Sequence, residues 1–271
     1  MLGTDVVAAA AAGHDVVALA RGDLDITDSD AVRLAMGDVQ PDAVINCAAW
    51  TDVDAAEAAE AQATLINGDG AGHVAAAAAS IGAHVVHVST DYVFGGNATS
   101  PYLEDMATGP IGAYGRSKLA GELAVAAAAP SSHAIVRTAW VFGPHGKNFV
   151  DTMLRLGAER DELTVVDDQL GCPTYTGHLA AALIAIAESR AHGVMHVAGG
   201  GQCTWWDLAV AIFARAGLSV KVHRGSSADL GRPAPRPAYS VLRSTRSDGP
   251  ALPAWQEGLA DHLIAREVLA S

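Results

Sequence analysis

Short runs of β-forming residues alternate, along the first half of this chain, with alanine-rich stretches that have helical spacing. The runs are Val16 to Leu19, Ala43 to Asn46, His84 to Ser89 and Ala134 to Thr138, and helix-like sequence follows each of them. Such alternation predicts parallel strands joined by helical crossovers. The run at 84–89 is nearly continuous in β-formers, as expected for a strand with helices over both faces. We therefore predict an α/β fold with a doubly wound, Rossmann-type parallel sheet.

The regular alternation of strand-like and helix-like sequence ends after about Phe142. The shorter elements that follow are interrupted by Gly143, Pro144, Gly171, Pro173 and a stretch rich in proline and arginine from Arg232 to Pro237. We predict two regions on this basis. Residues 1–142 form a dinucleotide-binding domain, and residues 143–271 form a mixed region that completes the sheet and builds a small C-terminal substrate-binding lobe.

Two adjacent tryptophans, Trp205 and Trp206, stand at a predicted helix start. Thr204 and Asp207 flank them with the spacing of a capping box, which opens a helix that runs through Ala216. Indole rings at such a place can line a pocket, but packing against the first helical turn is the safer interpretation. We therefore expect a structural role for both rings.

The start of the chain lacks the part of a dinucleotide fold that meets the pyrophosphate. Residues 3–12 have helical character, and the run at 16–19 then takes the place of the second strand. A first strand of ~5 residues and a glycine-rich turn normally precede this helix, whereas only Met1 and Leu2 precede Gly3. We predict that this strand and turn are missing and that Gly3 is the last glycine of the turn. A misplaced start would leave both in the upstream coding sequence.

The composition excludes several classes of partner. A formal net charge of -13 argues against a nucleic acid or an anionic membrane, since both reward clustered Lys and Arg. No run approaches the ~18 apolar residues of a membrane span, and no export signal opens the chain, so the cytoplasm is the predicted location. Cys47, Cys172 and Cys203 have no metal-ligand spacing, so we expect reduced structural thiols and assign no metal site.

One pair of residues points to chemistry. Tyr114 and Lys118 form Y-x-x-x-K, which places the phenol and the ammonium one helical turn apart. This common pattern gains weight because the run at 84–89 ends in Ser89 and Thr90, and hydroxyls at a strand's carboxyl end lie where ligands bind in open α/β sheets. Reduction of a ketone needs hydride at carbon and a proton at oxygen. We expect Tyr114 to supply the proton, Lys118 to lower the pKa of Tyr114, and Thr90 or Ser89 to hold the carbonyl oxygen.

Seven stretches of sequence carry a family resemblance. They are S-T-D-Y-V-F-G from Ser89, Y-G-R-S-K from Tyr114, R-T-A-W-V-F-G from Arg137, D-Q-L-G-C-P-T from Asp168, L-D-I-T from Leu24, N-C-A-A-W-T-D-V-D from Asn46 and R-P-A-Y-S-V-L from Arg236. Together they resemble the dTDP-4-dehydrorhamnose reductases, an extended branch of the short-chain dehydrogenase/reductase superfamily, from Gly3 almost to the C-terminus. The resemblance implies an NAD(P)H-dependent oxidoreductase that reduces the 4-keto group of dTDP-4-dehydro-6-deoxy-L-mannose to give dTDP-L-rhamnose, for nucleotide-sugar and cell-surface polysaccharide biosynthesis.

The resemblance also implies roles for individual residues. Thr90, Tyr114 and Lys118 are the catalytic set, with Tyr114 as proton donor and Lys118 also on the nicotinamide ribose. The dTDP-sugar substrate is implied to contact Asp91, Tyr92, Trp140, Asn148, Gln169 and Arg236. Arg236 makes sense independently, because a guanidinium fork suits a diphosphate in an otherwise acidic protein.

NADPH or NADH is expected to contact several parts of the chain. The predicted residues are Gly3 at the phosphate turn, Arg21 after the second strand, Asp25 and Ile26, which resemble the pair that meets the adenine, and Ala48, Ala49 and Trp50 after the next strand, with Lys118. Arg21 stands where an NAD-specific enzyme often places a carboxylate for the ribose hydroxyls, which favours NADPH. Asp23 is close enough to substitute, so the choice of cofactor stays open.

Two other functions remain open at this point. The same motifs fit a reductase of another dTDP-4-keto-deoxysugar for a secondary metabolite, because pocket shape sets stereochemistry. A non-catalytic regulatory subunit, like that of methionine adenosyltransferase, fits the missing phosphate turn, but it would not need Thr90, Tyr114 and Lys118. A homodimer is common in the resembling family, and we retain it as a candidate oligomeric state.

Overall fold

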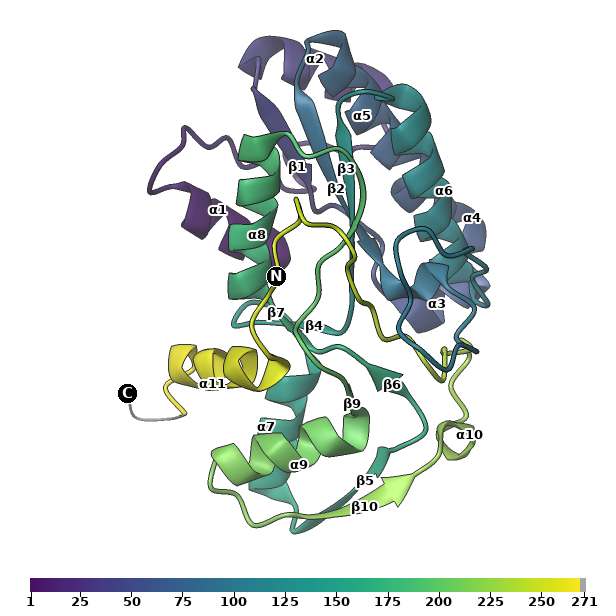
Figure 1. The fold of residues 1–271 in the computed structure, drawn as a ribbon, viewed down its shortest axis with the longest axis vertical. Helices are drawn as coiled ribbons and strands as arrows, with labels where there is room; N and C mark the ends of the chain where they lie inside the picture. The colour runs from purple at the N-terminus through teal and green to yellow at the C-terminus, as the bar shows by residue number, and fades with distance from the viewer. Residues whose placement is uncertain (269–271) are drawn as a thin grey trace.

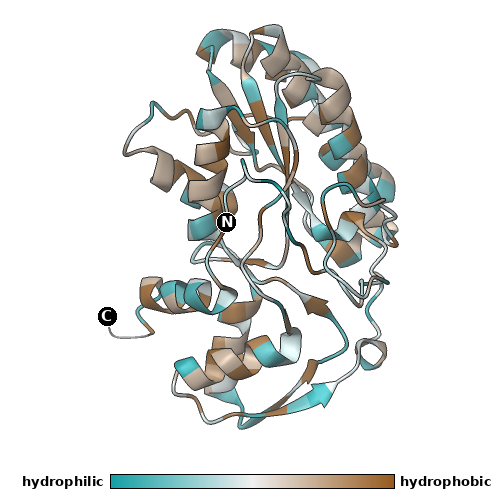
Figure 2. Ribbon diagram, viewed as in Figure 1, coloured by the Kyte–Doolittle hydropathy of each residue, from teal (hydrophilic) through white to brown (hydrophobic). Residues whose placement is uncertain are grey.

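A parallel sheet with helices on both faces occupies the upper part of the molecule, and a smaller lobe lies below it (Figure 1). The computed structural model describes residues 1–268. The sheet has the order β1 (Ala43–Asn46), β2 (His84–Thr90), β3 (His133–Thr138) and β8 (Gly193–His196), all parallel. Figure 2 shows hydrophobic residues along these strands. The predicted α/β class and parallel sheet are confirmed.

Strand alternation explains why both faces of the sheet are covered. Val85 faces the layer made by α5 (Ala71–Ser80) and α6 (Ala113–Ala128), whereas Val86, the next residue, faces α1 (Leu2–Ala10) and α8 (Thr176–Ser189). The helix α2 (Ser29–Val39) packs beside α5 on the outside of the first layer. Both faces of the sheet bury apolar side chains. We therefore look for polar functional groups at the ends of the strands.

The strand that we predicted over Val16 to Leu19 does not form. This segment pairs with no strand of residues 1–268, and the side chains of Val17 and Leu19 are 55% and 48% exposed. Within the same described residues, nothing pairs with the outer edge of β1. A strand forms only where its N–H and C=O groups find hydrogen-bonding partners, so the apolar pattern alone does not make one here.

The lower lobe has its own core. It contains α7 (Phe149–Glu159), α9 (Trp205–Arg215), α11 (Trp255–Ala265) and a two-stranded parallel sheet of β5 (Glu162–Val166) and β10 (Lys221–Gly225). Its buried side chains include Phe142, Val150, Leu208, Ile212 and Leu259. The predicted capping box is confirmed, since Thr204 caps α9 and pairs with Asp207.

The remaining elements are short. They are α3 (Val53–Ala58), α4 (Glu60–Thr64), a π-helix (Leu65–Gly70), a 3-10 helix (Asp91–Val93), β4 (Val141–Phe142), β6 (Leu170–Gly171), β7 (Thr174–Tyr175), β9 (Cys203–Thr204) and α10 (Ser227–Leu230). Among the helices of the described residues, none has the length and apolar character needed to cross a bilayer.

Candidate active site

The carboxyl end of β2 delivers the first polar groups of the site. Thr90 ends the strand, and the chain turns at once into the 3-10 helix that begins at Asp91. The Thr90 hydroxyl donates to Asp91 Oδ1 at 2.9 Å and accepts the Tyr92 N–H at 3.2 Å. Both Thr90 and Asp91 are buried, and the second carboxylate oxygen of Asp91 has no hydrogen-bond partner. Thr90 and Asp91 therefore place polar groups at the carboxyl end of β2, and one carboxylate oxygen of Asp91 can still accept a hydrogen bond.

Helix α6 brings Tyr114 to the same place. Gly115 makes this approach possible, because a methyl group there would overlap the carbonyl oxygen of Tyr92. The rings of Tyr114 and Tyr92 meet edge to face with 5.8 Å between their centroids. The Thr90 hydroxyl lies near enough to the Tyr114 phenol to lower the pKa of that phenol. The structure thus brings together Thr90, Asp91, Tyr92 and Tyr114, and their catalytic and substrate-binding roles stay predictions.

The acidity of Tyr114 differs from our expectation. Burial, together with the charge of Asp91, raises the pKa of its phenol to about 12, and only the nearby Thr90 hydroxyl lowers it. Lys118 was expected to lower this pKa, and that expectation is wrong for this structure. The reason is that Lys118 Nζ donates to the Val88 carbonyl at 2.7 Å and is held against β2.

Lys118 is buried in a network of nitrogen-containing side chains. Burial lowers the pKa of its amine to about 8, although the charge of Glu122 opposes this. Its Nζ lies 3.4 Å from His87 Nε2, and His87 Nδ1 lies 3.3 Å from Asn46 Nδ2. Burial also holds the pKa of His87 well below its usual range, so the imidazole is neutral. Asn46 Oδ1 in turn accepts the N–H of Ala48 at 3.1 Å. These contacts link Lys118 to residues 48–50, the predicted cofactor segment.

Ser89 takes no part in holding a carbonyl oxygen. Its hydroxyl donates to Glu122 Oε1 at 2.6 Å, beneath α6. Arg137 binds both oxygens of Glu122, at 2.9 and 2.7 Å, and both side chains are almost fully buried. Successive residues of a strand point to opposite faces, so of the two hydroxyls only Thr90 reaches the ligand side.

An asparagine that sequence reasoning missed ties the cofactor segment to α6. Asn67, in the π-helix, accepts the N–H of Trp50 at 2.8 Å and donates to Ser117 Oγ at 2.9 Å. Gly121 permits the close approach, because a methyl group there would overlap the Asn67 carbonyl. A π-turn is costly and often marks a functional site. The signal was an asparagine between apolar residues and glycines, in L-I-N-G-D-G.

The other predicted cofactor residues lie nearer the surface. Gly3 is in the first turn of α1, close to Cys47, and no side chain caps the helix start. Arg21 and Asp25 are exposed, and the backbone and hydroxyl hydrogen bonds of Thr27 lower the pKa of Asp25. Ile26 is half-buried against α2 and α5, while Ala48 is exposed and Ala49 is half-buried.

In the lower part of the site, Trp205 contacts both Trp140 and Gln169, although we had assigned Trp205 to packing at a helix start. Trp140 has a positive φ of 45°, and its ring lies over Gly171, where a methyl group would overlap it. The indole of Trp205 stacks on Trp140 with 3.6 Å between centroids and 5° between planes. Trp205 Nε1 also donates to Gln169 Oε1 at 3.0 Å. The expectation of mere helix-start packing was too narrow for Trp205.

The guanidinium of Arg236 lies at the predicted substrate site, where it is paired with Asp54. Its guanidinium binds both oxygens of Asp54, at 3.0 and 2.9 Å, and Arg232 adds a third bond at 3.1 Å. These hydrogen bonds, that of Arg236 first, lower the pKa of Asp54 to about 2. A cavity of about 260 Å³ is lined by Gln169, Ser227, Arg232 and Arg236, among others. Two of the predicted substrate residues therefore share one cavity.

Asn148 has a local structural role. Its Oδ1 caps α7 by accepting the Asp151 N–H at 2.9 Å, and its Nδ2 donates to the Gly143 carbonyl and to Asp151 Oδ2, both at 2.9 Å. Contact with a substrate remains a prediction for this residue.

The fold and the site together define a class of protein. A doubly wound parallel sheet that presents a threonine at a strand end, with Y-x-x-x-K on the next helix, is the arrangement of a short-chain dehydrogenase/reductase.

Comparison with known proteins gives the family. The sequence model described as the RmlD substrate binding domain matches residues 1–267, so the chain belongs to this family. A dTDP-4-dehydrorhamnose reductase from Mycobacterium tuberculosis is 46% identical over 277 residues, which cover 97% of this chain and 90% of that protein. A dTDP-4-keto-6-deoxy-D-glucose reductase from Streptomyces niveus is 45% identical over 244 residues, which cover 89% and 85%. The structure of a dTDP-4-dehydrorhamnose reductase from Bacillus anthracis in complex with NADP superposes with a TM-score of 0.95 at 37% identity, and covers 97% of this chain and 95% of that one.

Proposed function

We propose that this protein reduces the 4-keto group of dTDP-4-dehydro-6-deoxy-L-mannose with NADPH or NADH and so makes dTDP-L-rhamnose. The observation that carries the proposal is the meeting of the Tyr114 phenol with Thr90 and Asp91 at the carboxyl edge of the sheet. The mycobacterial relative, at 46% identity, is a dTDP-4-dehydrorhamnose reductase, which supports the same substrate here.

The residues present fit a nicotinamide cofactor. No side chain caps the first turn of α1, and the N–H groups before Thr4, whose own N–H donates to the Met1 carbonyl, are available to a pyrophosphate. Small side chains at Ala48 and Ala49 leave room beside the end of β1. When bound, the reduced nicotinamide supplies hydride. Lys118 would hold the nicotinamide ribose, and the exposed guanidinium of Arg21 favours NADPH over NADH.

The chemistry of the chain's own residues is proton delivery and orientation. As hydride reaches C4 of the sugar, the C=O π electrons move to O4, and Tyr114 gives its proton to that oxygen. The tyrosinate then recovers a proton from solvent. A free-protein pKa of about 12 keeps the phenol protonated and ready to donate.

Substrate recognition rests on groups with unused hydrogen-bonding capacity. The unpartnered oxygen of Asp91 would accept a sugar hydroxyl. Tyr92 and Trp140 would flank the sugar, and Arg236 with Gln169 would meet the nucleotide through the cavity that they share. A diphosphate competes with Asp54 for Arg236, because both offer paired anionic oxygens.

A second candidate is reduction of a related dTDP-4-keto-deoxysugar. The Streptomyces relative, at 45% identity, is named for such a sugar, and the residues above bind the dTDP group and the ketone without fixing the configuration at every carbon. The homodimer and the cytoplasmic location expected from the sequence stay predictions.

The test is to supply enzymatically generated dTDP-4-dehydro-6-deoxy-L-mannose with NADPH or NADH, and to identify the product by NMR. Consumption of the reduced cofactor with formation of dTDP-L-rhamnose is the expected result. A different C4 epimer, or turnover only with another 4-keto sugar, would favour the second candidate. A folded protein that consumes no cofactor with any of these sugars contradicts the reductase proposal and would favour a binding subunit.

A further inference from the structure

Trp205 contacts more of the predicted substrate site than any sequence pattern indicated. It is the first residue of α9, and its indole stacks on Trp140 with nearly parallel planes. On another side it meets Phe149, the residue after Asn148, with 4.6 Å between ring centroids. Its N–H donates to Gln169. One side chain therefore touches two of the predicted substrate residues and the neighbour of a third.

The bond from Trp205 fixes the direction of the Gln169 amide. Gln169 is buried; its Oε1 accepts from Trp205 Nε1 at 3.0 Å, and its Nε2 donates to Ser227 Oγ at 2.7 Å. A flipped amide would oppose donor to donor at Trp205, and its oxygen would face a Ser227 hydroxyl that already donates to Asp168. One amide proton and one lone pair remain free, and both point in a set direction beside the cavity that Gln169 shares with Arg236.

The stack also holds Trp140 in an unfavourable backbone conformation. A positive φ is rare for a residue with a large side chain, and such conformations persist where the surroundings enforce them, often at ligand sites. Here the ring is confined between Gly171 and Trp205. We propose that Trp205 is a positioning residue that sets the Trp140 ring and the Gln169 amide to receive the dTDP-sugar, an inference that rests on the proposed function.

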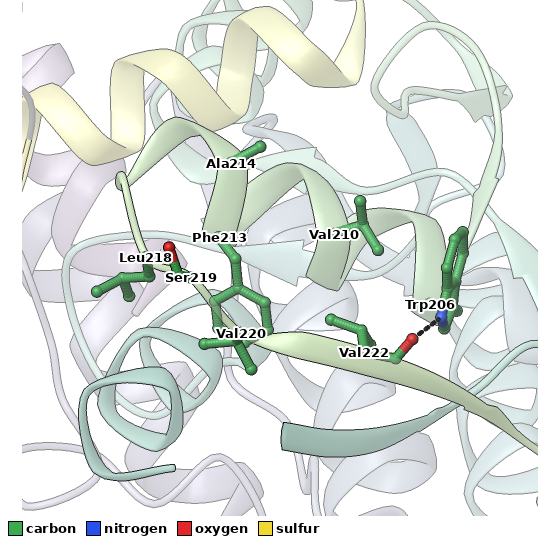
Figure 3. Close-up of a pocket in the computed structure, with 8 residues that line it drawn as sticks. All are labelled: Trp206, Val210, Phe213, Ala214, Leu218, Ser219, Val220 and Val222. Carbon is green, nitrogen blue, oxygen red and sulfur yellow. Dashed lines mark hydrogen bonds between the residues drawn. The ribbon is translucent and has the colours of Figure 1, made fainter. Parts of the chain in front are cut away.

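The neighbouring tryptophan provides a matched control. Figure 3 shows Trp206 on α9, where its ring borders an apolar groove with Val210 and Phe213. Trp206 Nε1 donates to the Val222 carbonyl at 3.0 Å, the same distance as the Trp205 bond. Trp205→Phe and Trp206→Phe thus remove the same chemical group from the same helical turn. Only the first removes it from the predicted substrate site.

The experiment compares the two variants by binding, kinetics and circular dichroism. We expect Trp205→Phe to weaken dTDP-L-rhamnose binding about tenfold in calorimetry, as for one lost hydrogen bond to a buried acceptor. Its KM for the keto sugar should rise by the same factor, while the KM for NADPH stays unchanged. Circular dichroism checks that both variants are folded, and Trp206→Phe should bind dTDP-L-rhamnose as the unaltered protein does.

Several results would overturn the proposal. One is equal weakening of dTDP-L-rhamnose binding in both variants, and another is no weakening in Trp205→Phe. A third is a rise in the KM for NADPH that matches the rise in the KM for the keto sugar, which would indicate general damage. Calorimetry requires no turnover, so a protein that binds dTDP-L-rhamnose and distinguishes the two variants, but reduces nothing, would refute the reductase and leave the role of Trp205 standing. Failure to bind dTDP-L-rhamnose would overturn both.

Discussion

Replacement of Asp91 by asparagine should change how the stability of the protein depends on pH. Asp91 is 2% exposed, and burial raises the pKa of its carboxyl from 3.8 to about 6, although the nearby hydroxyls of Ser240 and Thr90 oppose the rise. The folded state therefore binds more protons than the unfolded state between pH 3.8 and about 6. Stability decreases as the pH rises through this window, and it stays lower above it.

The size of the effect follows from the shift of about two pH units. Each unit corresponds to 1.36 kcal/mol, so ionised Asp91 costs the folded state about 3 kcal/mol at pH 7 and less than about 1 kcal/mol at pH 4. Asparagine is neutral throughout. The free energy of unfolding of the unaltered protein should therefore gain about 2 kcal/mol relative to Asp91→Asn when the pH falls from 7 to 4.

Urea unfolding of both proteins at several pH values measures this difference. The buried histidines titrate alike in both proteins, so their contributions cancel in the comparison. Parallel curves of unfolding free energy against pH would refute the argument that Asp91 carries a buried, costly charge. The same variant should raise the KM for the keto sugar about tenfold, because one hydrogen-bond acceptor for the sugar is altered.

Three more substitutions test separate parts of the account. Glu122→Gln leaves the buried guanidinium of Arg137 without its partner and should cost about 3–5 kcal/mol of stability in urea unfolding. Gly115→Ala forces a methyl group against the Tyr92 carbonyl and should lower kcat/KM at least about tenfold, because a small displacement of reacting groups is costly. Arg236→Lys replaces a fork by a point charge and should raise the KM for the dTDP-sugar about tenfold, with the KM for NADPH unchanged.

Two control variants separate these effects from general damage. Arg155→Gln breaks an exposed ion pair with Glu159 and should change stability by less than about 1 kcal/mol. Gly109→Ala places a methyl group where no atom lies within 4 Å, so kinetics should be unchanged. If Glu122→Gln costs no more than Arg155→Gln, or Gly115→Ala no more than Gly109→Ala, the corresponding argument fails. A KM for NADPH that rises with that for the sugar would contradict the role given to Arg236.

The parts of the fold that could be predicted are those in which local pattern and neighbours agree. The runs at 43–46 and 84–89 are apolar, and each finds a parallel partner. The run at 16–19 has the same pattern without a partner, and it stays unpaired. Strand formation depends on a neighbour, which periodicity cannot report.

The sequence motifs located Thr90 and Tyr114 in the site, but they could not predict the contacts and the pKa values of the side chains there. Lys118 and Tyr114 share one helix face, yet the lysine bonds to Val88, a contact set by how α6 lies on β2. The role of Asn67 depends on a π-turn and on Gly121, and that of Trp205 on a ring 65 residues away in the chain. Contacts between segments that are far apart in the chain produce no residue spacing from which they could be predicted.

The most direct test of the central claim is the turnover of Tyr114→Phe. This variant keeps the ring and removes only the hydroxyl that meets Thr90. With the dTDP-4-keto sugar and NADPH, kcat should fall by a factor of about 10²–10⁴, the usual contribution of a positioned general acid. Binding of dTDP-L-rhamnose and the melting temperature should stay near those of the unaltered protein. A Tyr114→Phe variant that turns over at the rate of the unaltered protein would contradict the account.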